Sequence, residues 1–116
     1  MRPPECPAPS QDLPLLATGG SEARYRDERI AHWNQVALWM DAHHGLSREY
    51  HRQLARIFRF LVPPGKRVLE IGSGQGDLLA ALQPARGVGV DFAGEMVERA
   101  QRKYPSLEFI TADAHA

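Results

Sequence analysis

The feature that most constrains the fold of this sequence is a glycine-rich loop that directly follows a short apolar run. Residues 67–71 have the composition of a buried strand, and Gly72, Gly74 and Gly76 then occupy alternate positions. Alternating glycines let the backbone turn sharply and let a ligand approach it without meeting a Cβ atom. The loop therefore predicts a strand that turns into a helix beside a site for a nucleotide-like ligand.

After residue 65 the chain alternates between strand and helix patterns. Strands are predicted over residues 67–71, 87–91 and 107–111, and helices over residues 76–82 and 93–104. A strand, helix, strand, helix, strand order is typical of a parallel sheet built from crossover connections. We therefore predict an α/β fold for this part of the chain.

Two helices are predicted ahead of the alternating region. Ser21 is the expected N-cap of the first, which extends to about Asp41 with apolar residues at helical spacing (Ile30, Trp33, Ala37 and Met40). Gly45 interrupts this pattern, and Ser47 is expected to cap the second helix, which Pro63 ends.

The second helix is predicted to be amphipathic. Tyr50, Leu54, Ile57, Phe58 and Leu61 occupy one side, and Arg48, Arg52, Arg56 and Arg59 occupy the other. The arginine side can contact an anionic substrate or nucleic acid, but a solvated helix face explains it more simply.

Three segments are expected along the chain. Residues 1–20 contain five prolines and are predicted to be a disordered leader, residues 21–62 form the helical segment, and residues 63–116 form the α/β region. The leader lacks the apolar stretch of a signal peptide, and Cys6 is the only cysteine, so a cytoplasmic protein is expected. The 14 basic and 14 acidic residues cancel, so overall charge predicts neither a nucleic acid nor a membrane as partner.

The loop spacing argues against a phosphate-bearing cofactor. A dinucleotide fingerprint needs a third glycine at position 77, which is Asp77, and Gly76 lies one place too early. A carboxylate there would repel a pyrophosphate, and no lysine completes a Walker A loop. Glu70 adds negative charge beside the turn. Such a site favours a ligand with an amine or a sulfonium and no phosphate, and S-adenosylmethionine has both cations.

Polar side chains follow the second and third predicted strands. Asp91 ends the second strand, where an acid can accept hydrogen bonds from ribose hydroxyls; it can also cap the following helix, and the two roles are compatible. Phe92 can lie against an adenine or in the core. Asp113, after the third strand, is placed to accept a hydrogen bond from an adenine amino group.

These residues resemble three motifs of the class I S-adenosylmethionine-dependent methyltransferases. The run from Val68 to Gly76 looks like the first motif, the run from Gly89 to Phe92 with Met96 resembles the second, and the run from Thr111 to Ala114 resembles the adenine-binding motif. The resemblance implies a Rossmann-like three-layer sandwich with a partial parallel sheet of strand order 3-2-1, preceded by the two helices.

The resemblance also implies a role for each residue of the cofactor site. The backbone of the loop would hold the methionine part, Glu70 would orient its amino group directly or through water, and Asp91 would bind the ribose. Phe92 and Met96 would border the adenine, and Asp113 with Ala114 would contact its amino edge. The implied cofactor-binding residues are Glu70, Gly72, Ser73, Gly74, Gly76, Asp91, Phe92, Met96, Asp113 and Ala114.

The chain departs from the family after the adenine motif. Class I enzymes have seven strands, and the later ones usually carry acceptor-binding and proton-handling groups, whereas only three are predicted here. We therefore expect a truncated methyltransferase with no assignable catalytic residue, a small-molecule acceptor, and a first strand left as an open sheet edge through which a homodimer can form.

Three alternatives remain from the sequence. The first is a fragment that binds S-adenosylmethionine, or only a protein partner, without catalysis. The second is a nicotinamide-dependent oxidoreductase, which the position of Gly76 disfavours. The third is a metal site at His43 and His44, which is disfavoured because adjacent helical residues point about 100° apart and no residue at the i+4 position completes a ligand set.

Overall fold

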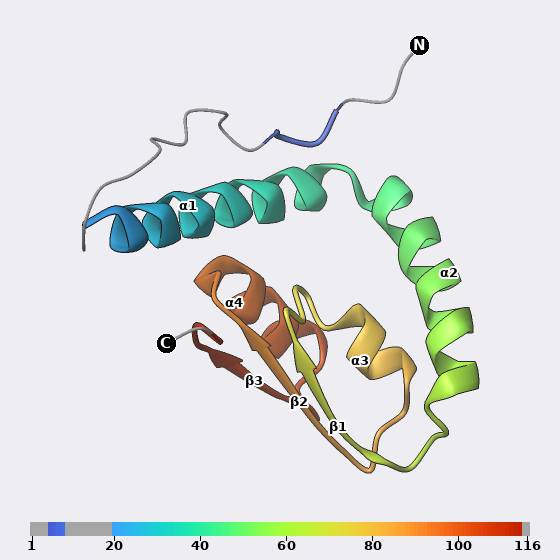
Figure 1. Cartoon of the computed structure of the whole chain (residues 1–116). Coiled ribbons are helices and arrows are strands. Elements are labelled where there is room, and N and C mark those ends of the chain that lie inside the picture. The colour runs from blue at the N-terminus through green and yellow to red at the C-terminus, as the bar shows by residue number, and fades with distance from the viewer. Residues whose placement is uncertain (1–4, 9–19, 115–116) are drawn as a thin grey trace.

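A computed structural model of the chain describes residues 5–8 and 20–114. Two helices precede a strand, helix, strand, helix, strand unit (Figure 1). The elements are α1 (Gly20–Ala42), α2 (His44–Leu61), β1 (Arg67–Ile71), α3 (Asp77–Ala81), β2 (Arg86–Asp91), α4 (Gly94–Lys103) and β3 (Glu108–Thr111). The leader predicted for residues 1–20 lies outside the described residues except for residues 5–8 and Gly20, where α1 begins.

The three strands form a parallel sheet in the order β1-β2-β3. The register pairs Glu70 with Gly89 and Gly89 with Phe109, so these three side-chain positions share one face. This arrangement confirms the predicted α/β class, the parallel sheet and the strand order 3-2-1.

The helix-facing side of the sheet is closed by Phe109 of β3. Its ring packs with Leu79, Val97 and Ala100 in one buried cluster. A Cβ atom at Gly89 would lie 2.6 Å from Cδ1 of Phe109, and a Cβ atom at Gly76 would overlap its Cζ. Glycines at these two positions therefore leave the space that the Phe109 ring fills.

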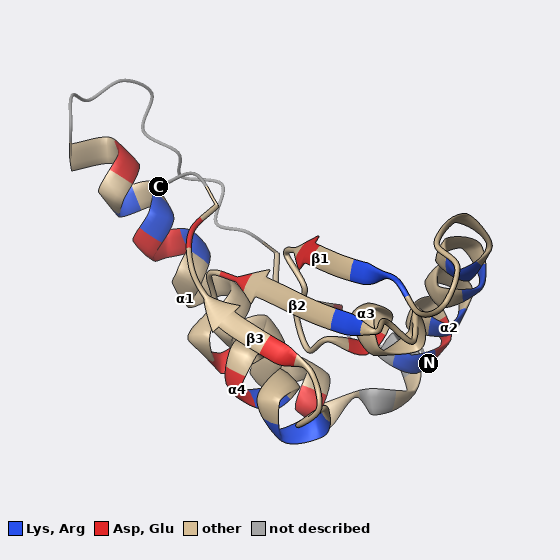
Figure 2. Ribbon diagram, turned by 90° about the horizontal axis from the view of Figure 1, so that it is seen from below, with Lys and Arg blue, Asp and Glu red and all other residues tan. Residues whose placement is uncertain are grey.

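The opposite face of the sheet is bare among the described residues. Leu69, Ile71 and Ile110 point to this face and are 62%, 65% and 42% exposed. Figure 2, which views the molecule from below, shows the strands with none of the described helices in front of them. The described elements therefore supply the sheet and the helices on one of its sides.

Helix α1 lies on α4 through an apolar cluster and a buried arginine. Val36 and Ala37 pack with Ala93 and Met96, and Trp33 and Met40 lie at the edge of the cluster. The predicted apolar spacing of this helix is thus confirmed.

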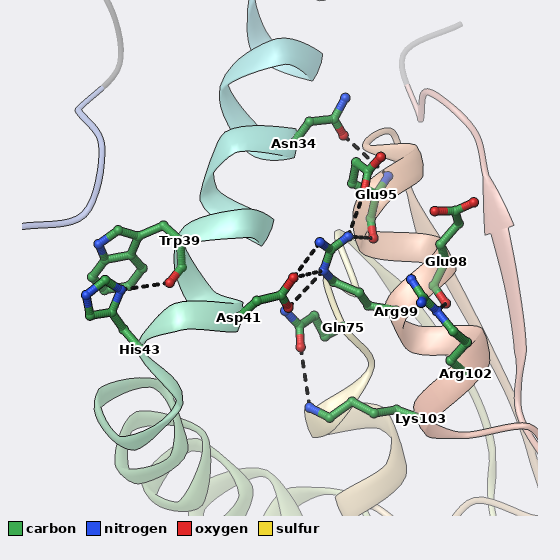
Figure 3. Close-up of polar contacts among 10 residues, drawn as sticks. All are labelled: Asn34, Trp39, Asp41, His43, Gln75, Glu95, Glu98, Arg99, Arg102 and Lys103. Carbon is green, nitrogen blue, oxygen red and sulfur yellow. Dashed lines mark hydrogen bonds and ion pairs between the residues drawn. The ribbon is translucent and has the colours of Figure 1, made fainter.

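The Arg99 side chain, 11% exposed, joins α4 to the end of α1 (Figure 3). Its Nε donates to Asp41 Oδ1 at 2.9 Å, and its Nη1 donates to Glu95 Oε2 at 2.7 Å. The hydrogen bond to Asp41, and to a smaller extent the one to Glu95, holds the pKa of Arg99 above its ordinary value. The guanidinium therefore stays charged while it clamps the two helices.

Helix α2 begins earlier than its sequence predicts. The chain leaves helical geometry at His43 (φ −131°, ψ 51°), whose Nδ1 lies 2.8 Å from the Trp39 carbonyl oxygen (Figure 3), and α2 starts at His44. The predicted cap at Ser47 is therefore wrong: Ser47 lies inside the helix, and Gly45 is accommodated in the first turn, where its backbone freedom costs little.

The orientation of α2 differs from what its amphipathic pattern favours. Ala55, on the arginine side, is buried, and Arg59 Nε donates to the Ala81 carbonyl at 2.8 Å. On the other side Tyr50 and Leu61 are 63% and 64% exposed. The helix thus turns its basic side toward the domain and its apolar side away from it. None of the described helices is long and apolar enough to span a membrane.

Replacing Gly76 should destabilise the fold more than replacing Gly94. Gly76→Ala places a Cβ atom against the Phe109 ring at a residue with φ of +81°, and we expect the unfolding free energy to fall by about 2–4 kcal/mol. Gly94→Ala, where a Cβ atom meets nothing within 4 Å, should be neutral or slightly stabilising. Urea denaturation compares them, and equal stability of the two variants would contradict the packing described.

Removing the Arg99 charge should loosen α1. Arg99→Met keeps much of the side-chain volume but loses both carboxylates, and we expect a loss of about 1–2 kcal/mol, since Asp41 and Glu95 are partly exposed. Hydrogen exchange should quicken across α1. Arg102→Met, at an exposed position of the same helix, is the control, and an equal effect there would rule out a specific clamp.

Candidate functional site

A cleft with a volume of about 790 Å³ opens at the carboxyl ends of the strands. Helix α1 forms one wall and the ends of all three strands form the other (Figure 1). Open α/β sheets bind ligands at this end of their strands. The lining residues include Tyr25, Arg26, Arg29, Trp33, Ile71, Gly72, Val90, Asp91, Phe92, Ala112, Asp113 and Ala114.

The Asp91 side chain, which lines the cleft, is fixed by two backbone hydrogen bonds. It is 8% exposed, its Oδ2 accepts a hydrogen bond from the Gly74 N–H at 2.9 Å, and its Oδ1 accepts one from the Ala93 N–H at 2.9 Å. Ala93 is the N-cap residue of α4, and no side chain caps the helix, so Asp91 does not cap α4 as its position suggested; it holds the N–H of the residue from which the helix starts. A carboxylate has about four lone-pair sites, so these two bonds leave acceptor capacity for a ligand.

The glycine loop is anchored to the end of β2. The Gly72 and Ser73 N–H groups donate to the Val90 carbonyl at 2.7 and 3.1 Å. Gly72 and Gly74 have positive φ (+77° and +54°), and a Cβ atom at either would meet nothing within 4 Å. The loop therefore exposes bare backbone next to the cleft, in a geometry that glycine adopts without strain.

Glu70 and Ser73 each place one buried oxygen atom beside the loop without a hydrogen-bond partner among the described residues. These atoms are Glu70 Oε2 and Ser73 Oγ. Burial raises the pKa of the Glu70 carboxyl to about 7; a backbone hydrogen bond at Leu79 opposes this shift, and the nearby charges of Asp91 and Asp77 add to it. Unpaired buried polar atoms are costly and cluster at functional sites.

The far end of the cleft is formed by Phe92, Asp113 and Ala114. Arg26 reaches from α1 to Asp113, with 3.8 Å between Nη1 and Oδ2. Arg29 lies over the Trp33 ring with its Cζ 6.0 Å from the centroid. The α1 wall thus brings two arginines, the Glu22 carboxyl and two aromatic rings to a cleft whose opposite wall carries two acids.

The structure brings half of the predicted cofactor residues to the cleft surface. Gly72, Asp91, Phe92, Asp113 and Ala114 line it. Glu70, Ser73, Gly74 and Gly76 lie in or beside the loop behind that surface, and Met96 is 3% exposed in the cluster under α1.

The family resemblance implies that the helices before residue 66 act as a partial lid over the site, but it named none of the α1 residues that line the cleft. Arg26, Arg29 and Trp33 recur at intervals of three and four residues and line the cleft together. This spacing could have indicated a shared helix face at the site, but it fits a core role for Trp33 equally well. Trp33 does pack at the edge of the α1–α4 cluster.

Comparison with known proteins agrees with this geometry. Residues 68–116 match the sequence model of a family described as a methyltransferase domain. No curated protein shows significant similarity to the chain.

Solved structures share the fold. A chain of the complex between the Haloferax volcanii Trm112 methyltransferase activator and a putative methyltransferase is 28% identical (TM-score 0.53), with 70% of this chain and 38% of that chain covered. The DhpI–SAH complex (22% identity, TM-score 0.58, 75% and 44% covered) and the YcgJ protein from Bacillus subtilis (24%, 0.51, 56% and 32% covered) show the same fold.

The chain spans less than half the length of each of these solved structures. The matched family region begins within β1 and includes the loop, Asp91 and Asp113. In its motifs and its fold, the chain is therefore similar to the S-adenosylmethionine-dependent methyltransferases of the Rossmann-like class.

Proposed function

We propose that the cleft binds S-adenosylmethionine and that the chain serves as the donor-binding part of a methyltransferase. The observation that carries this proposal is the Asp91 carboxylate, which holds the Gly74 N–H and the start of α4 while it lines the cleft. One side chain thereby couples the glycine loop to a ribose-binding position. The matched relatives are longer than this chain, so methyl transfer itself is part of the proposal.

The residues at hand fit such a cofactor. Glu70 Oε2, buried and without a partner among the described residues, suits the ammonium of the methionine part, and the open backbone at Gly72 and Gly74 suits its close approach. Asp91 has acceptor capacity for ribose hydroxyls, and Phe92 and Asp113 line the same cleft, which supports the proposed adenine contacts. The bordering roles of Ser73, Gly76, Met96 and Ala114 are part of the same proposal.

The electrostatics favour a cationic ligand over a dinucleotide. Glu70, Asp77 and Asp91 surround the loop, and the pKa of Glu70 rises partly because the other two are charged. A pyrophosphate placed there would meet carboxylates instead of free backbone N–H groups. A ligand with an ammonium and a sulfonium relieves the same repulsion.

When bound, the cofactor supplies an already activated methyl group. The chain's own residues would hold the donor in place and, through α1, exclude water from one side. No described residue is assigned as a general base.

We further propose a small-molecule acceptor and a cytoplasmic location. We also propose that the chain divides into segments at residues 20 and 62, and that the open edge of β1 is available to a second copy of the chain. The alternative is a fragment that binds the cofactor without catalysis.

Calorimetric titration with S-adenosylmethionine, S-adenosylhomocysteine and NAD tests the proposal. We expect saturable binding of the first two and none of NAD. Asp91→Asn should weaken binding about tenfold or more, because a charged acceptor is lost. Asp27→Asn, an exposed acid on α1 that does not line the cleft, is the control. Unchanged affinity in a folded Asp91→Asn protein, or binding of NAD, would overturn the assignment.

The buried Glu70 carboxyl predicts a pH dependence of stability without ligand. Its pKa is about 7 in the folded chain and near 4.5 when unfolded, so the folded state holds the extra proton between these values. The unfolding free energy should fall as pH rises from about 4.5 to 7 and level off above pH 7, and solvent screening of this partly exposed carboxyl reduces the size of the fall.

Glu70→Gln should remove that part of the slope, and Glu98→Gln, at an exposed position of α4, should keep it. Denaturation at pH 5 and pH 7.5 measures the difference between variants. If an ammonium binds Glu70, cofactor binding at pH 6 should also release a proton, seen as a buffer-dependent heat that Glu70→Gln abolishes. Identical slopes in all three proteins would exclude a buried protonated Glu70.

A further inference from the structure

A second cavity, with a volume of about 580 Å³, lies on the opposite side of the glycine loop between α2, α3 and α4. None of its described lining residues lines the cofactor cleft. Gln75 and Asp77 form its boundary with the loop. The cavity is therefore separate from the site proposed for the cofactor, and a ligand bound in it does not depend on a cofactor in the cleft.

The described lining of this cavity is strongly basic. Arg48, Arg52 and Arg59 from α2 and Lys103 from α4 contribute four positive charges, and Asp77 is the acid among them. A cavity with one dominant sign of charge concentrates ligands of the opposite sign.

The charge of Asp77 is already matched within the protein. Its Oδ1 accepts a hydrogen bond from Lys103 Nζ at 2.8 Å and one from the Tyr104 hydroxyl at 2.5 Å. Burial, followed by this contact, raises the pKa of Tyr104, so the phenol keeps its proton and remains a donor. Once Lys103 and Asp77 are paired, the three arginines are the uncompensated charges of the described lining.

The arginines have donors to spare. Arg59 uses its Nε on the Ala81 carbonyl, which leaves its terminal nitrogens. Arg52 pairs with Glu49 at 3.6 Å, but both side chains are at least 60% exposed, so this contact contributes little. His51 Nδ1, at the same wall, is buried and has no hydrogen-bond partner in the described part of the chain.

The orientation of α2 gives independent support for a ligand here. This helix has a continuous apolar side, yet it turns Arg48, His51 and Arg59 toward the domain and leaves Tyr50 and Leu61 in solvent. The three arginines stay exposed at this wall, so burial does not oppose their charge, but like charges set one turn apart repel each other. An anion between α2 and α4 supplies a counter-charge.

We infer that the cavity between α2, α3 and α4 binds a small phosphate-bearing anion, held by Arg48, Arg52 and Arg59. Guanidinium groups present planar forks that bind phosphate oxygens in pairs, which favours phosphate over a monovalent ion such as chloride. The site is the electrostatic reverse of the cofactor cleft, whose carboxylates disfavour phosphate.

Calorimetry with inorganic phosphate and with pyrophosphate, at constant ionic strength in chloride buffer, tests the inference on the full chain. We expect saturable binding of at least pyrophosphate. Arg52→Gln and Arg48→Gln should each weaken it about tenfold or more, because a charge-assisted contact is lost. Both positions are exposed on α2, so the substitutions should leave the fold intact.

Arg24→Gln is the matched control, because Arg24 is also an exposed helical arginine paired with a glutamate one turn away, but on α1 outside the cavity. It should bind both anions as the unaltered chain does. The inference would be overturned if the folded chain bound neither anion saturably, or if Arg24→Gln weakened binding as much as the α2 variants do. It would also be overturned if the chain bound a single-stranded RNA oligomer that pyrophosphate did not displace.

Discussion

The organisation of this domain depends on the Asp91 carboxylate. It accepts hydrogen bonds from the Gly74 and Ala93 N–H groups, so one buried side chain joins the end of β2, the glycine loop and the start of α4. Each bond involves a charged acceptor, and such bonds are the stronger kind in proteins. The geometry of the cleft therefore follows from an interaction inside the domain, and a ligand enters a loop that is already positioned.

Much of the fold could be predicted because its signals are local. Strand composition, alternating glycines and helix-period apolar residues lie within a few positions of one another, and they identified β1, β2 and β3, whereas the strand order came from the family resemblance. The start of α2 was placed incorrectly because Gly45 looks like a break, whereas the break occurs at His43, whose ring approaches the Trp39 carbonyl.

The remaining features arise from contacts that are distant along the chain. Gly89 is required by the ring of Phe109, and Arg99 finds Asp41 from another helix. The inward turn of the arginine side of α2 reverses the usual meaning of an amphipathic pattern, because periodicity identifies two sides of a helix but not which one is covered. The residues of the α1 wall could not be named for the same reason, since Arg26 and Trp33 gain their position only when α1 lies over the strand ends.

The glycine loop separates two environments of opposite charge. Asp91 and Asp113 line the cleft, and the arginines of α2 line the second cavity. Figure 2 shows the basic residues of α2 in blue. Lys103 bridges this boundary by binding Asp77 at 2.8 Å, with Gln75 Oε1 also 3.4 Å from its Nζ. Because Lys103 pairs with Asp77 and burial raises the pKa of Glu70 to about 7, Asp91 is left as the main carboxylate beside the loop. The two cavities therefore differ in the charge of their linings although a single loop divides them.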